Sequence, residues 1–125
     1  MDCLPQLHIA AIHAEPGYNS VVPGIAVLCS LPELNNLIGS IGTYQNSIGK
    51  RSNYIVGGQY LGHVGTIKYG YIVGFVDGYP IRDGAPIPMG AAIVSIPMQE
   101  GQLHLTIIPP VPHYTPMLVQ FSVSF

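Results

Sequence analysis

The sequence predicts a single all-β domain over residues 1–125, an antiparallel β-sandwich or jelly roll with one short helix near 31–38. Three observations predict this class. The chain of 125 residues fits one domain. Fifteen glycines and twelve prolines oppose long helices. Short apolar runs recur at a spacing of roughly ten residues, with Gly- and Pro-containing turns between them.

Period-two alternation marks the strands most clearly in three segments. In 119–125, valine and phenylalanine alternate with glutamine and serine, which is the pattern of a half-buried strand. Segments 102–107 and 66–76 repeat the alternation, and the glycines of 66–76 predict bends, bulges or close approach of another backbone. Further strands are expected at 6–14, 20–29, 53–60 and 91–96.

One segment has the features of a helix. Ser30 is placed to cap a helix over 31–38, and Glu33 is placed to complete a capping box. Gly39 would end the helix. At about two turns it would cover one end of the sheets and would not form a layer.

Low charge is the strongest compositional signal. Charged residues make up 8% of the chain, against about 25% in ordinary globular domains. A free monomer would expose large neutral areas, and such areas usually mark interfaces. We therefore expect a homo-oligomer within a larger protein assembly. Four basic residues are too few for a nucleic-acid site, and no apolar run suits a membrane span. No nucleic-acid or membrane partner is expected.

The beginning of the chain lacks the positive and long apolar regions of a signal peptide. Synthesis in the cytoplasm, without secretion, is the expectation, followed by incorporation into a virion or another particle. Cys3 and Cys29 are able to form one disulfide, but in a reducing compartment two free thiols are favoured.

The histidines do not have the spacing of metal ligands. The pattern His-x-His is absent, and it is the pattern that a metal-binding cupin needs. Surface or turn positions are the favoured interpretation for each histidine. No metal and no cofactor is expected. One alternative stays open, a metal site at a symmetry axis to which each subunit contributes one histidine.

Catalytic motifs are also absent from the sequence. The six acidic residues are scattered, and Asp77 and Asp83 lie in glycine-containing turns, where aspartate serves local hydrogen bonding. No Gly-x-Ser-x-Gly elbow occurs, and neither cysteine has a basic neighbour. We expect no enzyme.

Tyrosine is the most prominent of the residue types that could serve function. Five of the eight tyrosines lie in the middle third, at positions 54, 60, 69, 71 and 79. Sheet packing and subunit contact explain them equally well, with carbohydrate stacking behind both. The strand 119–125 is expected to pair within its own sheet or to add to a neighbour's edge. The interface or packing candidates are Tyr69, Tyr71, Phe75, Phe121, Val123 and Phe125.

Three functional classes follow. The first is a non-enzymatic structural protein of a virion, such as a capsid decoration (cement) or tail protein. In composition and predicted architecture the chain resembles small jelly-roll phage decoration proteins, a resemblance that implies a trimer on a capsid. The second is a lectin-like carbohydrate-binding module. The third is a small cupin-like metalloenzyme that would use His63, His104 or His113. In the first class, Phe121→Ser or Phe125→Ser should weaken folding or assembly more than His104→Ala.

Overall fold

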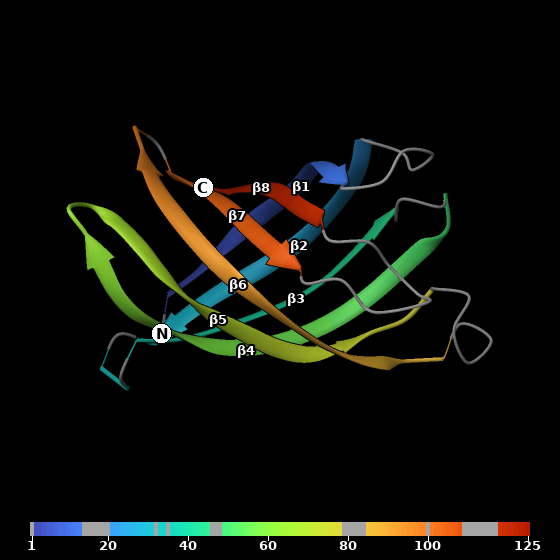
Figure 1. The fold of residues 1–125 in the computed structure, drawn as a ribbon, viewed down its shortest axis with the longest axis horizontal. Coiled ribbons are helices and arrows are strands. Elements are labelled where there is room, and N and C mark those ends of the chain that lie inside the picture. The colour runs from blue at the N-terminus through green and yellow to red at the C-terminus, as the bar shows by residue number, and fades with distance from the viewer. Residues whose placement is uncertain are drawn as a thin grey trace.

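The computed structural model describes residues 2–13, 21–31, 33–34, 36–45, 49–78, 85–99, 101–108 and 118–125. They form a closed barrel of antiparallel strands in which each strand pairs with the next, and the last strand pairs with the first (Figure 1). The strands are β1 (Asp2–His13), β2 (Val21–Leu31), β3 (Leu37–Gln45), β4 (Arg51–Val64), β5 (Ile67–Val76), β6 (Ile87–Met98), β7 (Gly101–Ile108) and β8 (Leu118–Ser124).

The predicted sandwich or jelly roll is wrong, because the eight strands close into one barrel. The all-β class is confirmed. Alternation and turn spacing identify strands, and both look the same in a sandwich and in a barrel. What separates the two is the pairing of β8 with β1, which joins opposite ends of the sequence and has no local signal. That seam includes a hydrogen bond of 3.1 Å from the Phe125 N–H to the Pro5 carbonyl.

The predicted helix at 31–38 is also wrong. β2 continues to Leu31 and β3 begins at Leu37, so a short turn occupies the interval. The Leu34 N–H donates to the Leu31 carbonyl over 3.1 Å, and Asn36 has a positive φ of 59°. A helix of two turns is marginal by itself, whereas β3 gains backbone hydrogen bonds from strands on both sides. Within the described residues there is no helix long and apolar enough to cross a membrane.

The other predicted strands each overlap a strand of the barrel. The segments 119–125, 102–107 and 66–76 correspond to β8, β7 and β5. Several features of the sequence analysis lie outside the described residues: Tyr79, Asp83, His113, the last residue of the segment predicted as 6–14 and the first residue of the segment predicted as 20–29.

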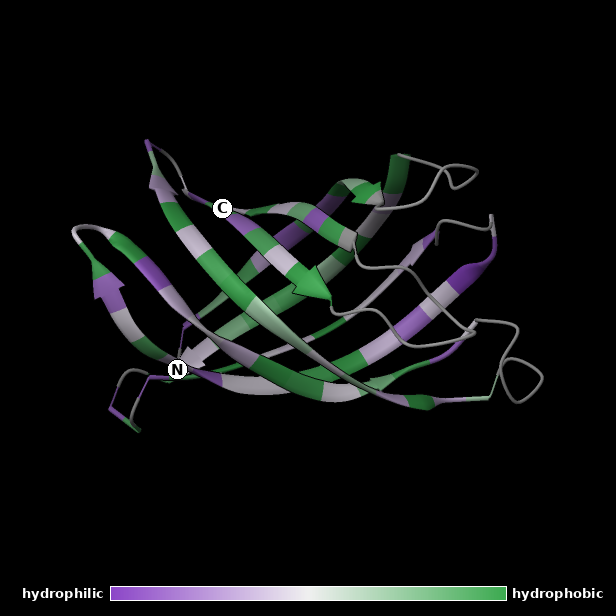
Figure 2. Ribbon diagram, viewed as in Figure 1, coloured by the Kyte–Doolittle hydropathy of each residue, from purple (hydrophilic) through white to green (hydrophobic). Residues whose placement is uncertain are grey.

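The alternation along β8 is present, but the polar side chains are the buried ones. Gln120, Ser122 and Ser124 are 8%, 1% and 0% exposed, whereas Phe125 is 53% exposed. Buried polar side chains also occur on β1, β4, β6 and β7, at Gln6, Ser52, Ser95 and His104. Hydrophilic and hydrophobic residues alternate along several of the strands (Figure 2). The barrel therefore has a partly polar lumen and an apolar outer face, the opposite of an ordinary soluble domain.

The connections at the two ends of the barrel differ in length. Both chain ends lie at one end, where the connections are 32–36, 65–66 and 99–100 (Figure 1). The connections at the other end are 14–20, 46–50, 77–86 and 109–117. We call these the short-turn end and the long-loop end.

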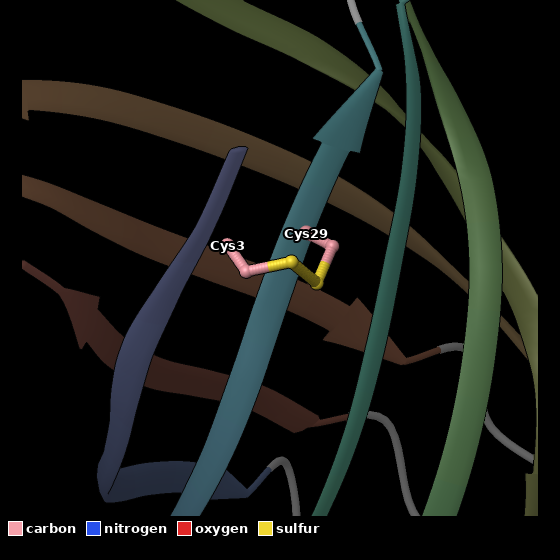
Figure 3. Close-up of a disulfide and its surroundings, with 2 residues drawn as sticks. All are labelled: Cys3 and Cys29. Atoms are coloured by element: carbon pink, nitrogen blue, oxygen red, sulfur yellow. A yellow bond between two sulfur atoms is a disulfide. The ribbon is translucent and has the colours of Figure 1, made fainter. Parts of the chain in front are cut away.

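Cys3 and Cys29 form a disulfide, so the expectation of two free thiols is wrong (Figure 3). The two residues are directly opposite each other on β1 and β2, with Cα atoms 4.0 Å apart. This pairing depends on strand register, which cysteine spacing alone does not reveal. Closing a loop across a separation of 26 residues stabilises the fold by about 3 kcal/mol in the chain-entropy model.

Candidate functional site: the lumen and the outer belt

A chain of hydrogen bonds crosses the lumen from β8 to β1 and β4. The Gln120 amide Nε2 donates to His8 Nδ1 over 3.2 Å. His8 Nε2 lies 2.7 Å from the Tyr54 hydroxyl. Because Nδ1 accepts from an amide nitrogen, a neutral His8 carries its proton on Nε2 and donates it to Tyr54. The position of Gln120 thus fixes the tautomer of His8.

The chain continues through β3 and returns to β8. The Ser40 hydroxyl donates to Gln6 Oε1 over 3.1 Å, so its only proton is used there. The Tyr54 hydroxyl, 3.0 Å from Ser40 Oγ, must therefore be the donor to Ser40. Gln6 Nε2 then donates to Ser122 Oγ over 2.9 Å. All five hydrogen bonds point in one direction, which binds strands from opposite sides of the lumen together.

A second polar cluster surrounds His104, which is completely buried. His104 Nδ1 lies 2.7 Å from Ser95 Oγ, and His104 Nε2 lies 2.8 Å from Ser124 Oγ. The Tyr60 hydroxyl, 2.5 Å from Ser95 Oγ, extends the cluster to β4. Among the described residues, every buried side-chain nitrogen and oxygen has a hydrogen-bond partner. A lumen built in this way avoids the cost of buried, unpaired polar groups.

The opposite wall of the lumen has an apolar cluster at its centre. Ile38, Val56, Ile72 and Ile93 are buried together, one each from β3, β4, β5 and β6. The lumen-facing glycines of β5 lie against the backbone of β4: a Cβ on Gly70 would stand 2.0 Å from the Gln59 carbonyl oxygen. The close approach predicted for the glycines of this strand is therefore present.

The space left between the two walls is small. A cavity of about 50 Å³ is lined by residues from both walls, including Gln6, His8, Ile72 and Ile93. It has room for a few water molecules at most. Side chains fill the rest of the lumen, as is usual for an eight-stranded barrel, so the lumen forms a packed interior without a wide channel.

The surface interpretation of the histidines is wrong for His104 and His8, which lie in the lumen. It is right for His63, which is exposed. In the described ranges no three histidine, cysteine, aspartate or glutamate side chains come together in a way that would hold a metal ion. The structure thus places His104 with two serines and a tyrosine, a set of partners that serves hydrogen bonding.

Exposed apolar side chains cover the outside of the strands, and we call them the outer belt. They extend continuously over β1 to β5, and half-buried apolar residues continue the belt across β6, β7 and β8. The belt comprises Leu7, Ile9, Ile12, Val21, Ile25, Val27, Leu37, Ile41, Ile55, Leu61, Val64, Ile67, Tyr69, Tyr71, Val73, Phe75, Met98, Ile107 and Phe125.

The six residues predicted as interface or packing candidates all face outward. Tyr69, Tyr71 and Phe75 are 45%, 40% and 55% exposed on β5, and Phe125 belongs to the belt as well. Phe121 and Val123 are half-buried on the outer face of β8. They share the outer surface of the barrel without forming one compact cluster. Their use as an interface stays a prediction.

Sequence reasoning missed the polar residues of the lumen. The signal was present in β8, where Gln120, Ser122 and Ser124 alternate with apolar residues. In β1 the signal is shorter, because only Gln6 and His8 alternate with the apolar Leu7 and Ile9. Ser40 carries no comparable signal, because β3 contains few other polar residues at the same spacing. No protein-family model matches the chain, and comparison with curated proteins found no similar sequence.

Proposed function

We propose that this protein is a membrane-embedded β-barrel whose lumen is plugged by its own side chains, so that it acts as an anchor and not as a pore. The observation that carries the proposal is the combination of an outer belt of exposed apolar residues with a partly polar, hydrogen-bonded lumen. Barrels that cross membranes alternate apolar-out and polar-in along every strand, and their strand number is usually even.

The dimensions of the strands support the proposal. A strand of ten residues such as β5 is about 33 Å long and, at a tilt of about 40°, rises about 25 Å along the barrel axis. That rise matches the apolar band of about 25 Å found on membrane barrels.

The distribution of charge supports it as well. Of the charged residues in the part of the chain that the structure describes, only Asp2, Arg51 and Lys68 lie within strands, and each is the first or second residue of its strand. The central part of every strand is therefore free of charge. A charged side chain on the lipid face costs about 2–4 kcal/mol at the midplane of a bilayer, so this distribution is the one that a bilayer would require.

Two further features fit the same proposal. Short connections at one end and longer ones at the other are typical of membrane barrels. The Cys3–Cys29 disulfide supports a location on the oxidising side of a cell, where disulfides persist. This location departs from the cytoplasmic and particle-bound one expected from the sequence, which stays an untested prediction.

A second candidate is the structural role in a virion or another assembly that the sequence suggested. Its support is the low charge together with the outward position of Tyr71, Phe75 and Phe125. A flat protein partner covers one side of a barrel, however, whereas the outer belt runs over five consecutive strands. A lipid bilayer covers every side, and we therefore place the assembly role second.

The absence of tryptophan from the chain allows a direct test. Val73→Trp would put one tryptophan on the outer belt near the middle of β5, where Val73 is 55% exposed. After reconstitution into vesicles, lipids with brominated acyl chains should quench its fluorescence strongly. Lys50→Trp, in the connection before β4, is the matched control and should be quenched little. Vesicles containing the unaltered barrel should conduct no ions, because the lumen is filled.

A protein that is monodisperse in buffer without detergent, with equal quenching at both positions, would overturn the membrane proposal. If that soluble form were a discrete trimer, the result would favour the assembly role.

A further inference from the structure

A recess of about 720 Å³ opens at the short-turn end of the barrel. It lies where β4 and β5 extend beyond a bulge at Tyr60 and Gly62, opposite residues of β6 and β7. The volume is within the range of small-molecule sites, which is roughly 300–1,000 Å³. It is separate from the small cavity of the lumen, with which it shares no lining residue.

The walls of the recess have two kinds of surface. Tyr60, Leu61 and Pro97 supply an aromatic ring and apolar side chains. Asn36 and Gln102 supply side-chain amides that are able to donate hydrogen bonds. Such a combination of an apolar surface and a few polar groups is typical of sites for small organic ligands.

Lys68 provides the only formal charge among the described residues that line the recess. Its Nζ lies 5.4 Å from the centre of the Tyr60 ring, and no carboxylate in the described residues pairs with it. Asp2 and Glu33, which belong to the same end of the barrel, do not line the recess. A cation without a carboxylate partner, beside an aromatic ring, is suited to a ligand that carries the opposite charge.

We propose that this recess binds a small organic anion, with its phosphate or carboxylate group on Lys68 and its apolar body against Tyr60 and Pro97. The site is open to solvent at the short-turn end, so a ligand reaches it without passing through the filled lumen. The inference does not depend on membrane insertion, because all of the groups that line the recess belong to one barrel.

Phenyl phosphate is the probe that matches both parts of the recess. We would titrate it into the protein in neutral maltoside micelles, or in plain buffer if the protein proves soluble, and follow backbone amide resonances by NMR. Saturable shifts are expected at Gly62, Gly65 and Thr66, which line the recess. Benzyl alcohol, which has a similar ring and no charge, should bind at least about fivefold more weakly.

Three variants decide the role of Lys68. Lys68→Gln should weaken phenyl phosphate binding by about fivefold or more, whereas Lys68→Arg should keep most of the affinity. Lys50→Gln, at the long-loop end, is the matched control for net charge and should bind like the unaltered protein. Unchanged binding by Lys68→Gln, equal loss in both glutamine variants, or shifts spread over the whole barrel would overturn the proposal.

A competition experiment separates two sources of the anion. If phosphatidylglycerol in the micelles displaces phenyl phosphate, the site takes a lipid headgroup. If it does not, the site takes a soluble phosphate or carboxylate. A negative result in the tryptophan quenching experiment would contradict membrane insertion and would not affect the phenyl phosphate titration. The two proposals therefore fail independently.

Discussion

The two walls of the lumen hold the barrel together by different means. On the wall formed mainly by β7, β8 and β1, buried polar groups such as His104 and Gln6 bond to one another. On the wall formed by β3 to β6, four aliphatic side chains form an apolar cluster, against which the rings of Tyr54 and Tyr60 pack. The polar wall depends on the orientation of each donor, whereas the apolar wall depends on volume alone.

This difference teaches that burial and hydrophobicity are separate properties in this barrel. Ser124 is fully buried while Phe125, the next residue, is more than half exposed. Removing one partner of a buried hydrogen bond should therefore destabilise the polar wall, because the other partner is left unsatisfied. Replacing both partners by apolar residues should cost less. The apolar wall should respond to lost volume in the ordinary way.

His104→Leu should have the largest effect. The substitution fills the space with an apolar side chain, but it leaves the Ser124 hydroxyl without a partner and the Ser95 hydroxyl with Tyr60 alone. The unpaired Ser124 hydroxyl costs up to about 3 kcal/mol and the lost bond to Ser95 about 1 kcal/mol, so we expect a loss of about 4 kcal/mol in the free energy of unfolding, measured by urea denaturation. This reverses the expectation from the sequence that His104 tolerates substitution better than Phe125 does.

The control for His104→Leu is the triple variant with Ser95→Ala and Ser124→Ala. It should recover part of the lost stability, since the Ser95 and Ser124 hydroxyls are removed and only the Tyr60 hydroxyl then loses its partner. A triple variant no more stable than His104→Leu would show that the hydrogen bonds are not the source of the effect.

Ile72→Ala on the apolar wall should cost less, about 3 kcal/mol, through lost apolar burial and the cavity left behind. Ile72→Val, which removes one methylene, should cost about 1 kcal/mol in the same urea experiment. The two costs should follow the volume removed. A cost below about 0.5 kcal/mol for Ile72→Ala would mean that the wall collapses to fill the space.

Gln120→Leu should have the smallest effect, because it removes one donor from the chain and leaves the other four bonds in place. We expect a loss of about 1 kcal/mol. The more specific readout is nitrogen NMR of His8, which should show the proton on Nε2 in the unaltered protein and a mixture of tautomers in Gln120→Leu. A proton found on Nδ1 in the unaltered protein would contradict the direction of the chain.

Most of the strands were predictable from local sequence, because alternation over 102–107 and 119–125 is a property of neighbouring residues. The strand β3 was not, because the capping pattern of Ser30 and Glu33 imitates a helix start and the competing sheet contacts are not local. The lumen site was not predictable either. Alternation divides a strand into two faces, but it does not state which of the two faces the lumen once the strands close into a barrel.

The seam between β1 and β8 has a consequence for the time course of folding. Its partners are among the most distant in the chain, as in the hydrogen bond between Gln6 and Ser122 with a separation of 116 residues. Successive hairpins can form as the chain emerges, but the seam has to wait for β8, the last strand to be synthesised. Long-range pairing slows folding because the chain loses the entropy of closing a long loop before the new strand contacts stabilise it. Until the seam forms, the half-made sheet has two open edges able to pair with strands of other molecules.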